Sequence, residues 1–292
     1  MNLILTLMLF PLLASAASLL IRKSKPRNIV ARGSVIVIIA LTLAVVWQYF
    51  KTGVSLTFEN ETIIDDILMI IEAAVAVYII IVSLRSKKYL VTAFAAVQTP
   101  LLIWFELTQK HGIEVHSAIV FDKLSAIMVL IIGVIGGLVC LYAVGYMQWY
   151  HIHHKDYEKR KAFFFSILFL FLSAMFGLVL SNNLTWIYFC WELTTLCSFL
   201  LIGYTRTAKA RNNAFRALVI NLGGGLAFAA AIVLIGMNYK TLELSALIAM
   251  KPEAMLLIPL FLLAVAALTK SAQLPFSSWL LGAMVAPTPT SA

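Results

Sequence analysis

Hydrophobic residues occur along this chain in long runs that are separated by short polar segments. A helix needs about 20 apolar residues to cross the hydrocarbon core of a bilayer, and the runs have this length. The pattern therefore predicts an all-α, polytopic membrane protein with about nine transmembrane helices. The runs lie near residues 2–21, 34–50, 63–84, 89–107, 118–145, 163–181, 184–204, 214–237 and 255–273.

The last segment of the chain, 274–292, has a different pattern. Pro275, Pro287 and Pro289 interrupt it, and the apolar stretch between these prolines is too short to cross a bilayer. Proline lacks a backbone N–H and its ring clashes with the carbonyl group four residues earlier. The segment therefore predicts a broken helix at the C-terminal end of the sequence.

Composition supports a membrane protein. Of the 292 residues, 62% are apolar and only 12% are charged, whereas soluble domains have roughly 45–50% apolar and about 25% charged residues. This balance excludes a soluble enzyme, a disordered chain and a small disulfide-rich secreted module. The net charge of +9 lies in the segments between apolar runs and not on one face, so we expect the lipid bilayer and no nucleic acid as a partner.

Most of the 22 Lys and Arg residues fall in alternate loops. Cytoplasmic loops of membrane proteins carry this excess of positive charge. We therefore expect a multi-pass protein of the cell's inner (cytoplasmic) membrane, with its N-terminus outside. The basic loops lie near residues 22–32, 85–88, 155–161 and 206–216.

Metal and cofactor chemistry finds little support in the sequence. The three cysteines have no C-x-x-C spacing, and all five histidines lie outside the apolar runs. His151, His153 and His154 are close together, but without a further ligand they predict a solvated interfacial loop. We expect no metal and no cofactor on this chain.

Three ionisable residues lie well inside predicted spans: Glu72, Glu192 and Lys270. Such residues are costly in a bilayer and usually functional. Glu192 shares one face of its predicted helix with further polar residues, which indicates a face turned toward protein or water. These possible supporting residues are Thr185, Tyr188 and Thr195. The alternative is a buried, hydrogen-bonded carboxyl group that only packs helices together.

Lys270 stands shortly before Pro275, where a helix break frees backbone carbonyl groups. Broken helices are tolerated in membranes where they are buried or line a water-filled cavity. Lys270 could bind the freed carbonyls and stay near enough to water to exchange a proton, or it could extend to the membrane surface as an anchor. With Glu192 it could form a proton switch, in which both groups tend toward neutral when apart and toward charged when together. Glu72 has no flanking motif, so a lateral proton group and a structural helix contact both stay open.

Several strings then carry a resemblance to a known family. WELTTLCSFLLIGY, with Glu192, and TKSAQLPFSSWLLGAMVAPTPTSA, with Lys270, resemble signature segments of the antiporter-like proton-pumping subunits of respiratory complex I, Mrp antiporters and energy-converting hydrogenases. FDKLSAIM at 121–128 and GYM at 145–147 resemble an earlier helix of the same family. FSSWLLGAMVAPTP is most similar to the large membrane subunit of Ech-type group 4 nickel–iron hydrogenases.

The resemblance implies ion-translocating roles for Glu192 and Lys270, with Lys270 on a discontinuous helix. It divides the chain into N-terminal transmembrane helices, 1–117, and the first half of an antiporter-like translocation domain, 118–292. Gly225 stands where complex I subunits often carry an Asp. Family members continue into a second helical repeat, which leaves a truncated product, a partial reading frame and half of a split subunit as alternatives.

The expected function is therefore that of a non-catalytic, proton- or sodium-translocating membrane subunit of a redox-driven oxidoreductase complex, such as an energy-converting hydrogenase. Its partners would be other membrane subunits and, through them, soluble iron–sulfur and nickel–iron subunits. The alternative is a subunit of an Mrp-type cation/proton antiporter with no redox partner. A third possibility is a subunit that only fills space in a complex.

Overall fold

The computed structural model describes residues 2–21, 23–58, 61–109, 112–113, 115–154, 160–250 and 254–291, and helices dominate it. The helices are α1 (Asn2–Leu20), α2 (Ser24–Tyr49), α3 (Glu61–Arg85), α4 (Tyr89–Thr108), α5 (Lys123–Leu130), α6 (Gly137–His153), α7 (Lys161–Leu180), α8 (Leu184–Ile202), α9 (Ala208–Tyr239), α10 (Leu244–Ala249), α11 (Ala254–Lys270), α12 (Ser278–Ala283) and α13 (Thr288–Ser291). A π-helical stretch, η1 (Ile131–Gly136), joins α5 to α6, and β1 (Val54–Leu56) pairs with β2 (Ile119–Phe121).

Eight helical segments within the described residues are long and apolar enough to cross a membrane, which confirms an all-α polytopic membrane protein. One of these segments runs without interruption through α5, η1 and α6, from Lys123 to His153. The ninth predicted span corresponds to α11, which has 17 residues and is shorter than the others. Beyond it, α12 and α13 are short pieces, so residues 274–291 form the broken helix that the prolines predict.

Polar side chains set where several helices begin. Asp122 accepts a hydrogen bond from the backbone N–H of Ser125 at the start of α5. Asn183 accepts one from the N–H of Thr185 at the start of α8. Such caps satisfy N–H groups that have no partner in the first turn of a helix.

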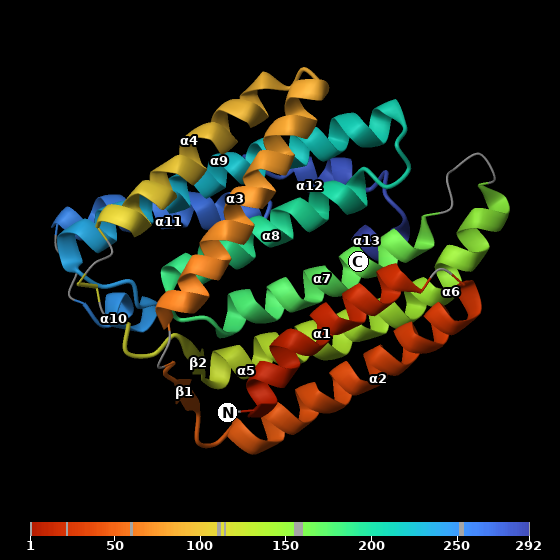
Figure 1. Cartoon of the computed structure of the whole chain (residues 1–292), viewed down its shortest axis with the longest axis horizontal. Helices are drawn as coiled ribbons and strands as arrows, with labels where there is room; N and C mark the ends of the chain where they lie inside the picture. Colours follow the sequence, from red (N-terminus) through yellow and green to blue (C-terminus); the bar gives the residue numbers. More distant parts are fainter. Residues whose placement is uncertain are drawn as a thin grey trace.

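Helix α8 lies at the centre of the bundle. It packs against α7 on one side and against α9 on another, while the α3–α4 hairpin covers both α8 and α9. Figure 1 shows α1, α2, α6 and α7 together on one side and α4, α9 and α11 on the other, with α8 between them. Most residues of α8 are buried in this position, including Glu192.

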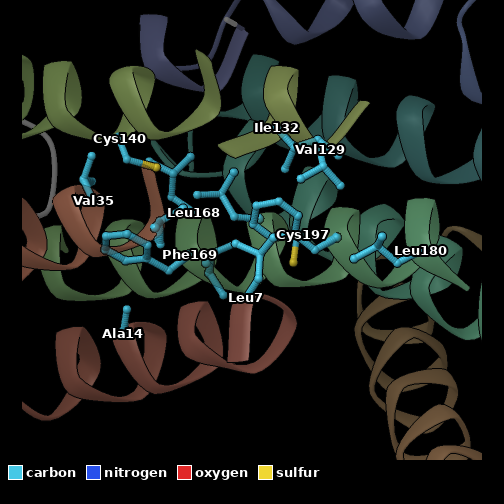
Figure 2. Close-up of a cluster of buried hydrophobic side chains, with 14 of the residues drawn as sticks. Leu7, Ala14, Val35, Val129, Ile132, Cys140, Leu168, Phe169, Leu180 and Cys197 are labelled. Atoms are coloured by element: carbon cyan, nitrogen blue, oxygen red, sulfur yellow. The ribbon is translucent and has the colours of Figure 1, made fainter. Parts of the chain in front are cut away.

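The largest hydrophobic cluster joins α1, α2, α5, α6, α7 and α8. Figure 2 shows this cluster, with Leu7 and Ala14 near Phe169 and with Cys140 and Cys197 among the surrounding side chains. Because lipid tails are as apolar as these side chains, close van der Waals packing and not the hydrophobic effect holds such helices together inside a bilayer. Cys140 and Cys197 are both buried in this core.

The two ends of the bundle differ in how they are joined. At one end, which we call the β end, β1 pairs with β2, and isolated bridges join Ile119 to Ser181 and Asn183 to Glu243. At the other end, the basic end, Arg160 binds the backbone carbonyl of Tyr204, and Arg27 interacts electrostatically with Tyr204. Basic loops that the sequence places on one side of the membrane thus meet at one end. Arg22 and residues 155–159 of these loops lie outside the described residues.

His151 differs from its expected place. It lies in α6 and is 4% exposed, and its Nε2 atom forms a hydrogen bond of 2.9 Å with the hydroxyl group of Tyr204. The prediction of a solvated loop is therefore wrong for this histidine. The helix extends eight residues past the expected end of its apolar run, to His153, and carries the imidazole ring against Tyr204.

Candidate functional site

Lys270, the last residue of α11, reaches across to α8. Its Nζ atom donates hydrogen bonds to the carbonyl oxygen of Trp191 at 2.9 Å and to Thr195 Oγ1 at 2.8 Å. The ammonium group also lies 4.9 Å from the centre of the Trp191 indole ring. A cation above an aromatic face is stabilised by the ring quadrupole. The side chain of Lys270 is thus held inside the bundle and does not extend to the surface as an anchor.

Glu192 lies next to these contacts on α8 and is 4% exposed. Its side chain forms a hydrogen bond with Gln98 of α4 and interacts electrostatically with Lys270, while its Oε1 atom is buried without a hydrogen-bond partner. Both bonds of Lys270 go to other residues of α8. The two ionisable groups are therefore neighbours. The hydrogen bonds of Lys270, however, go to Thr195 and the Trp191 carbonyl and not to the Glu192 carboxyl group.

Gly225 of α9 provides the space that Glu192 occupies. A Cβ atom at this position would collide with Glu192 Oε1 and would lie 3.1 Å from Gln98 Oε1. Gly225 is thus part of the surface that surrounds the Glu192 carboxyl group. A carboxylate at position 225 would require the Glu192 side chain to move.

Glu72 of α3 approaches the same region from the side of the α3–α4 hairpin. It interacts electrostatically with Glu192 and with Glu106 of α4, and its Oε1 atom is buried without a hydrogen-bond partner. Tyr188, which is 1% exposed, interacts with Glu72 and Glu192, and its hydroxyl group likewise has no partner. The interior of the bundle therefore contains several acceptor and donor atoms that need a proton or a water molecule.

Only part of the predicted polar stripe of α8 joins this cluster. Thr195 binds Lys270 and Tyr188 lies near Glu192, as described above. Thr185 is buried, but its hydroxyl group donates to Asn183 Oδ1 at 2.8 Å, at the N-terminus of the helix. Thr185 thus belongs to the helix cap and contributes no contact to Glu192 or Lys270.

The helix break follows Lys270 directly. Helix α11 ends at this residue, and Ala272 adopts a left-handed backbone conformation with φ of 52°, before Pro275 is reached. The indole N–H of Trp279 donates to the carbonyl oxygen of Thr269 at 2.9 Å. The expectation that Lys270 binds carbonyls freed by the break is therefore wrong, because Trp279 binds one of them and Lys270 turns toward α8.

Close packing of α9 against α11 keeps the lysine near α8. A Cβ atom at Gly224 of α9 would collide with the side chain of Thr269 on α11, one residue before Lys270. Small residues allow helix backbones to approach in this way in a membrane. The glycine triplet 223–225 thus positions both members of the pair, Gly224 through α11 and Gly225 through Glu192.

Sequence reasoning missed three residues of this site. Gln98 lies in the middle of an apolar run, and a lone amide inside a span was the available signal. Trp191 acts through its carbonyl oxygen and ring, and Trp279 through its indole N–H; no sequence pattern distinguishes these from ordinary apolar positions. Among the residues that the structure describes, no group of three or more His, Cys, Asp or Glu side chains is placed to hold a metal ion.

Two family models match the chain. Residues 181–292 match the family described as NADH:quinone oxidoreductase/Mrp antiporter, transmembrane region, and residues 104–165 match the N-terminus of chain 5 of NADH-ubiquinone oxidoreductase (complex I). The first of these segments contains Glu192, Gly225 and Lys270, and Gln98 lies before both.

Curated relatives include Na(+)/H(+) antiporter subunit A1 of Staphylococcus haemolyticus, which is 40% identical over 176 residues. The corresponding subunit of Staphylococcus aureus is 36% identical over the same length. In both cases the match covers 59% of this chain and 21% of the relative, so the matched region spans about a fifth of these proteins. These relatives favour the antiporter alternative over the hydrogenase interpretation.

A solved structure shares the fold. A chain of the Mrp complex from Dietzia sp. DQ12-45-1b superposes with a TM-score of 0.67 at 24% identity, and the superposition covers 99% of this chain and 26% of that one. The solved structure thus shares the fold of this chain, and the sequence matches identify residues 104–165 and 181–292 as parts of the antiporter-like family of membrane subunits of complex I and Mrp antiporters.

Proposed function

We propose that this chain forms part of an Mrp-type cation/proton antiporter subunit and that Glu192 and Lys270 carry protons through it. One observation carries the proposal: Lys270 is hydrogen-bonded to α8 at Trp191 and Thr195, beside a buried carboxyl group with an unpartnered oxygen atom. Ionisable residues such as lysine and glutamate are energetically costly inside a bilayer, and they are usually functional.

The geometry supports a switch between two arrangements. Opposite charges that approach each other in a medium of low dielectric constant attract strongly, and this attraction falls as they separate. In the arrangement described here, Thr195 and the Trp191 carbonyl hold the lysine apart from the glutamate. A movement of Lys270 toward Glu192 would favour the charged forms of both groups. Its return would favour the neutral forms, in which Lys270 has lost a proton and Glu192 has gained one.

Glu72 and Tyr188 supply a route from the side. They interact with Glu192, and Glu72 also interacts with Glu106. We propose that a proton passes between Glu72 and Glu192 near the Tyr188 hydroxyl group, with Gln98 orienting the Glu192 carboxylate. This route enters from the α3–α4 hairpin, most of which lies before the first residue matched by a family model.

The driving force is an ion gradient in this proposal. The curated relatives are named as Na(+)/H(+) antiporter subunits, which supports exchange of a monovalent cation against protons. We expect other membrane subunits as partners, whereas soluble redox subunits have no support. The charge pattern of the loops supports a cytoplasmic membrane with the N-terminus outside.

Exchange in everted membrane vesicles that contain the intact complex tests this function. Addition of Na⁺ or K⁺ to respiring wild-type vesicles should release protons from the lumen, as read by a fluorescent pH indicator. Glu192→Gln should lower the exchange rate at least tenfold, because the amide cannot carry a proton. Glu243→Gln is the matched control: this buried carboxylate accepts a bond from the backbone N–H of Ser117 at the β end, and an amide oxygen can still accept it.

Two results would contradict the proposal. Exchange at the wild-type rate in Glu192→Gln would return the glutamate to a structural role. Proton movement that needs an electron donor and no cation gradient would restore the redox-driven interpretation.

A further inference from the structure

A cavity of about 400 Å³ opens at the basic end, away from Glu192 and Lys270. It lies where the C-terminal ends of α3 and α8 meet the N-terminal ends of α7 and α9. Its lining combines two kinds of side chain. Three arginines contribute to it, Arg160, Arg206 and Arg211, and among the residues that the structure describes no Asp or Glu lines it.

Arg160 is fixed in place beside this cavity. Its guanidinium group donates to the carbonyl oxygen of Tyr204 and lies 5.3 Å from the ring centres of both Phe163 and Tyr204. The planar guanidinium matches the oxygen atoms of a phosphate group and can contact them in pairs. Arg206 and Arg211 are exposed at the rim, where they can approach the same ligand.

The rest of the lining is mainly apolar. The rings of Phe199 and Phe215 contact each other in its wall, tilted by 60° with their centres 5.2 Å apart, and Tyr78 and Val82 contribute the side of α3. Helix α3 also has exposed apolar residues beyond the cavity, Ile81 at 44% and Leu84 at 49% exposure. This exposed apolar surface of α3 is suited to contact with lipid acyl chains.

We propose that this cavity binds the phosphate headgroup of an anionic phospholipid, with the arginines on the phosphate and the acyl chains along α3. Basic pockets between transmembrane helices at the cytoplasmic side bind such headgroups. A soluble phosphate would use the arginines alone, whereas a lipid also uses the apolar wall. The proposal concerns a site separate from Glu192 and Lys270 and does not depend on the antiporter function.

The full chain, delipidated in mild detergent, provides the test. It is titrated with phosphatidylglycerol, phosphatidylcholine or inorganic phosphate, and bound lipid is counted by native mass spectrometry, with the shift in unfolding temperature as a second readout. The Arg206→Gln/Arg211→Gln double variant should lose at least tenfold in affinity for phosphatidylglycerol. These two rim residues are chosen because Arg160 also holds Tyr204, so that its loss could affect folding.

The matched control is Lys209→Gln/Arg216→Gln, which removes the same amount of charge from α9, close to the cavity but outside its lining. It should bind phosphatidylglycerol like the wild type. An equal loss in both double variants would show a non-specific charge effect and overturn the proposal. Equal affinity for phosphatidylcholine, or displacement of the lipid by inorganic phosphate at similar concentration, would also overturn it.

Discussion

The ammonium group of Lys270 lies 2.9 Å from the carbonyl oxygen of Trp191, the residue that precedes Glu192 in the chain. The lysine on the broken helix is therefore attached to the backbone of the helix that carries the glutamate. Because a backbone carbonyl cannot change its charge, this contact holds the lysine without neutralising it. Charge changes at Glu192 can then act on Lys270 while the two helices stay in contact.

Replacement of Lys270 tests whether its proton is used. Lys270→Arg and Lys270→Ala should each lower cation/proton exchange at least tenfold in vesicles that contain the intact complex. Arginine keeps the positive charge but does not lose a proton in proteins, and its planar group has a different donor geometry. Near-normal exchange in Lys270→Arg would show that only the charge is needed.

Thr195 and Thr194 form a matched pair on α8. Both hydroxyl groups donate to the Trp191 carbonyl, but only Thr195 also accepts a bond from Lys270. A hydrogen bond to a charged group contributes about 1.5–3 kcal/mol, so Thr195→Val should slow exchange by roughly tenfold or more. Thr194→Val should stay near the wild-type rate. Similar losses in the two variants would mean that only helix packing had been disturbed.

The glycines of α9 allow a test of the space around Glu192. Gly225→Ala should lower exchange strongly, because the added methyl group displaces the carboxylate and crowds Gln98. Gly223→Ala is the control, since its added carbon would lie 3.8 Å from Phe94, an ordinary contact. Both variants add one methyl group to the same helix turn. Assembly of each variant is checked by the amount of complex recovered from membranes.

The helix cap formed by Asp122 allows a prediction of how stability depends on pH. The hydrogen bond from the backbone N–H of Ser125 holds the pKa of this carboxyl group below its usual value of 3.8. A lowered pKa contributes stability above the usual value, and this contribution is lost as the pH falls through the lowered pKa. Asp122→Ala should therefore reduce the free energy of unfolding by about 1 kcal/mol at pH 7, while Asp122→Asn keeps a cap.

Thermal unfolding of the purified chain in detergent measures this effect. The difference between the wild type and Asp122→Asn should shrink as the pH falls below the usual value of 3.8 and through the lowered pKa of Asp122. Because Asp122 is exposed, solvent screening keeps the charge-dependent part small. A constant difference across this pH range would contradict the capping role of the carboxylate.

The hydrophobic pattern predicted the membrane class and most helix positions because a bilayer demands long apolar segments. Glu192 and Lys270 were found because ionisable residues are rare in such segments. The pattern could not predict that Gln98 binds Glu192, since this contact depends on how the α3–α4 hairpin packs on α8 and α9. It also could not predict that Trp279 takes the freed carbonyl of Thr269, which depends on the path of the chain after α11.

The strands and bridges of the β end fix one end of the bundle, and this affects how Lys270 can move relative to Glu192. Backbone hydrogen bonds there join the starts of α5 and α8 to the segment after α9, for example from Leu184 N–H to the Leu242 carbonyl. Lys270 lies at the far end of α11, a helix about 25 Å long. If α11 pivots near the β end, a tilt of about 5° displaces Lys270 by about 2 Å, given a rise of about 1.5 Å per residue. A small tilt of α11 can then break or restore the hydrogen bonds between Lys270 and α8.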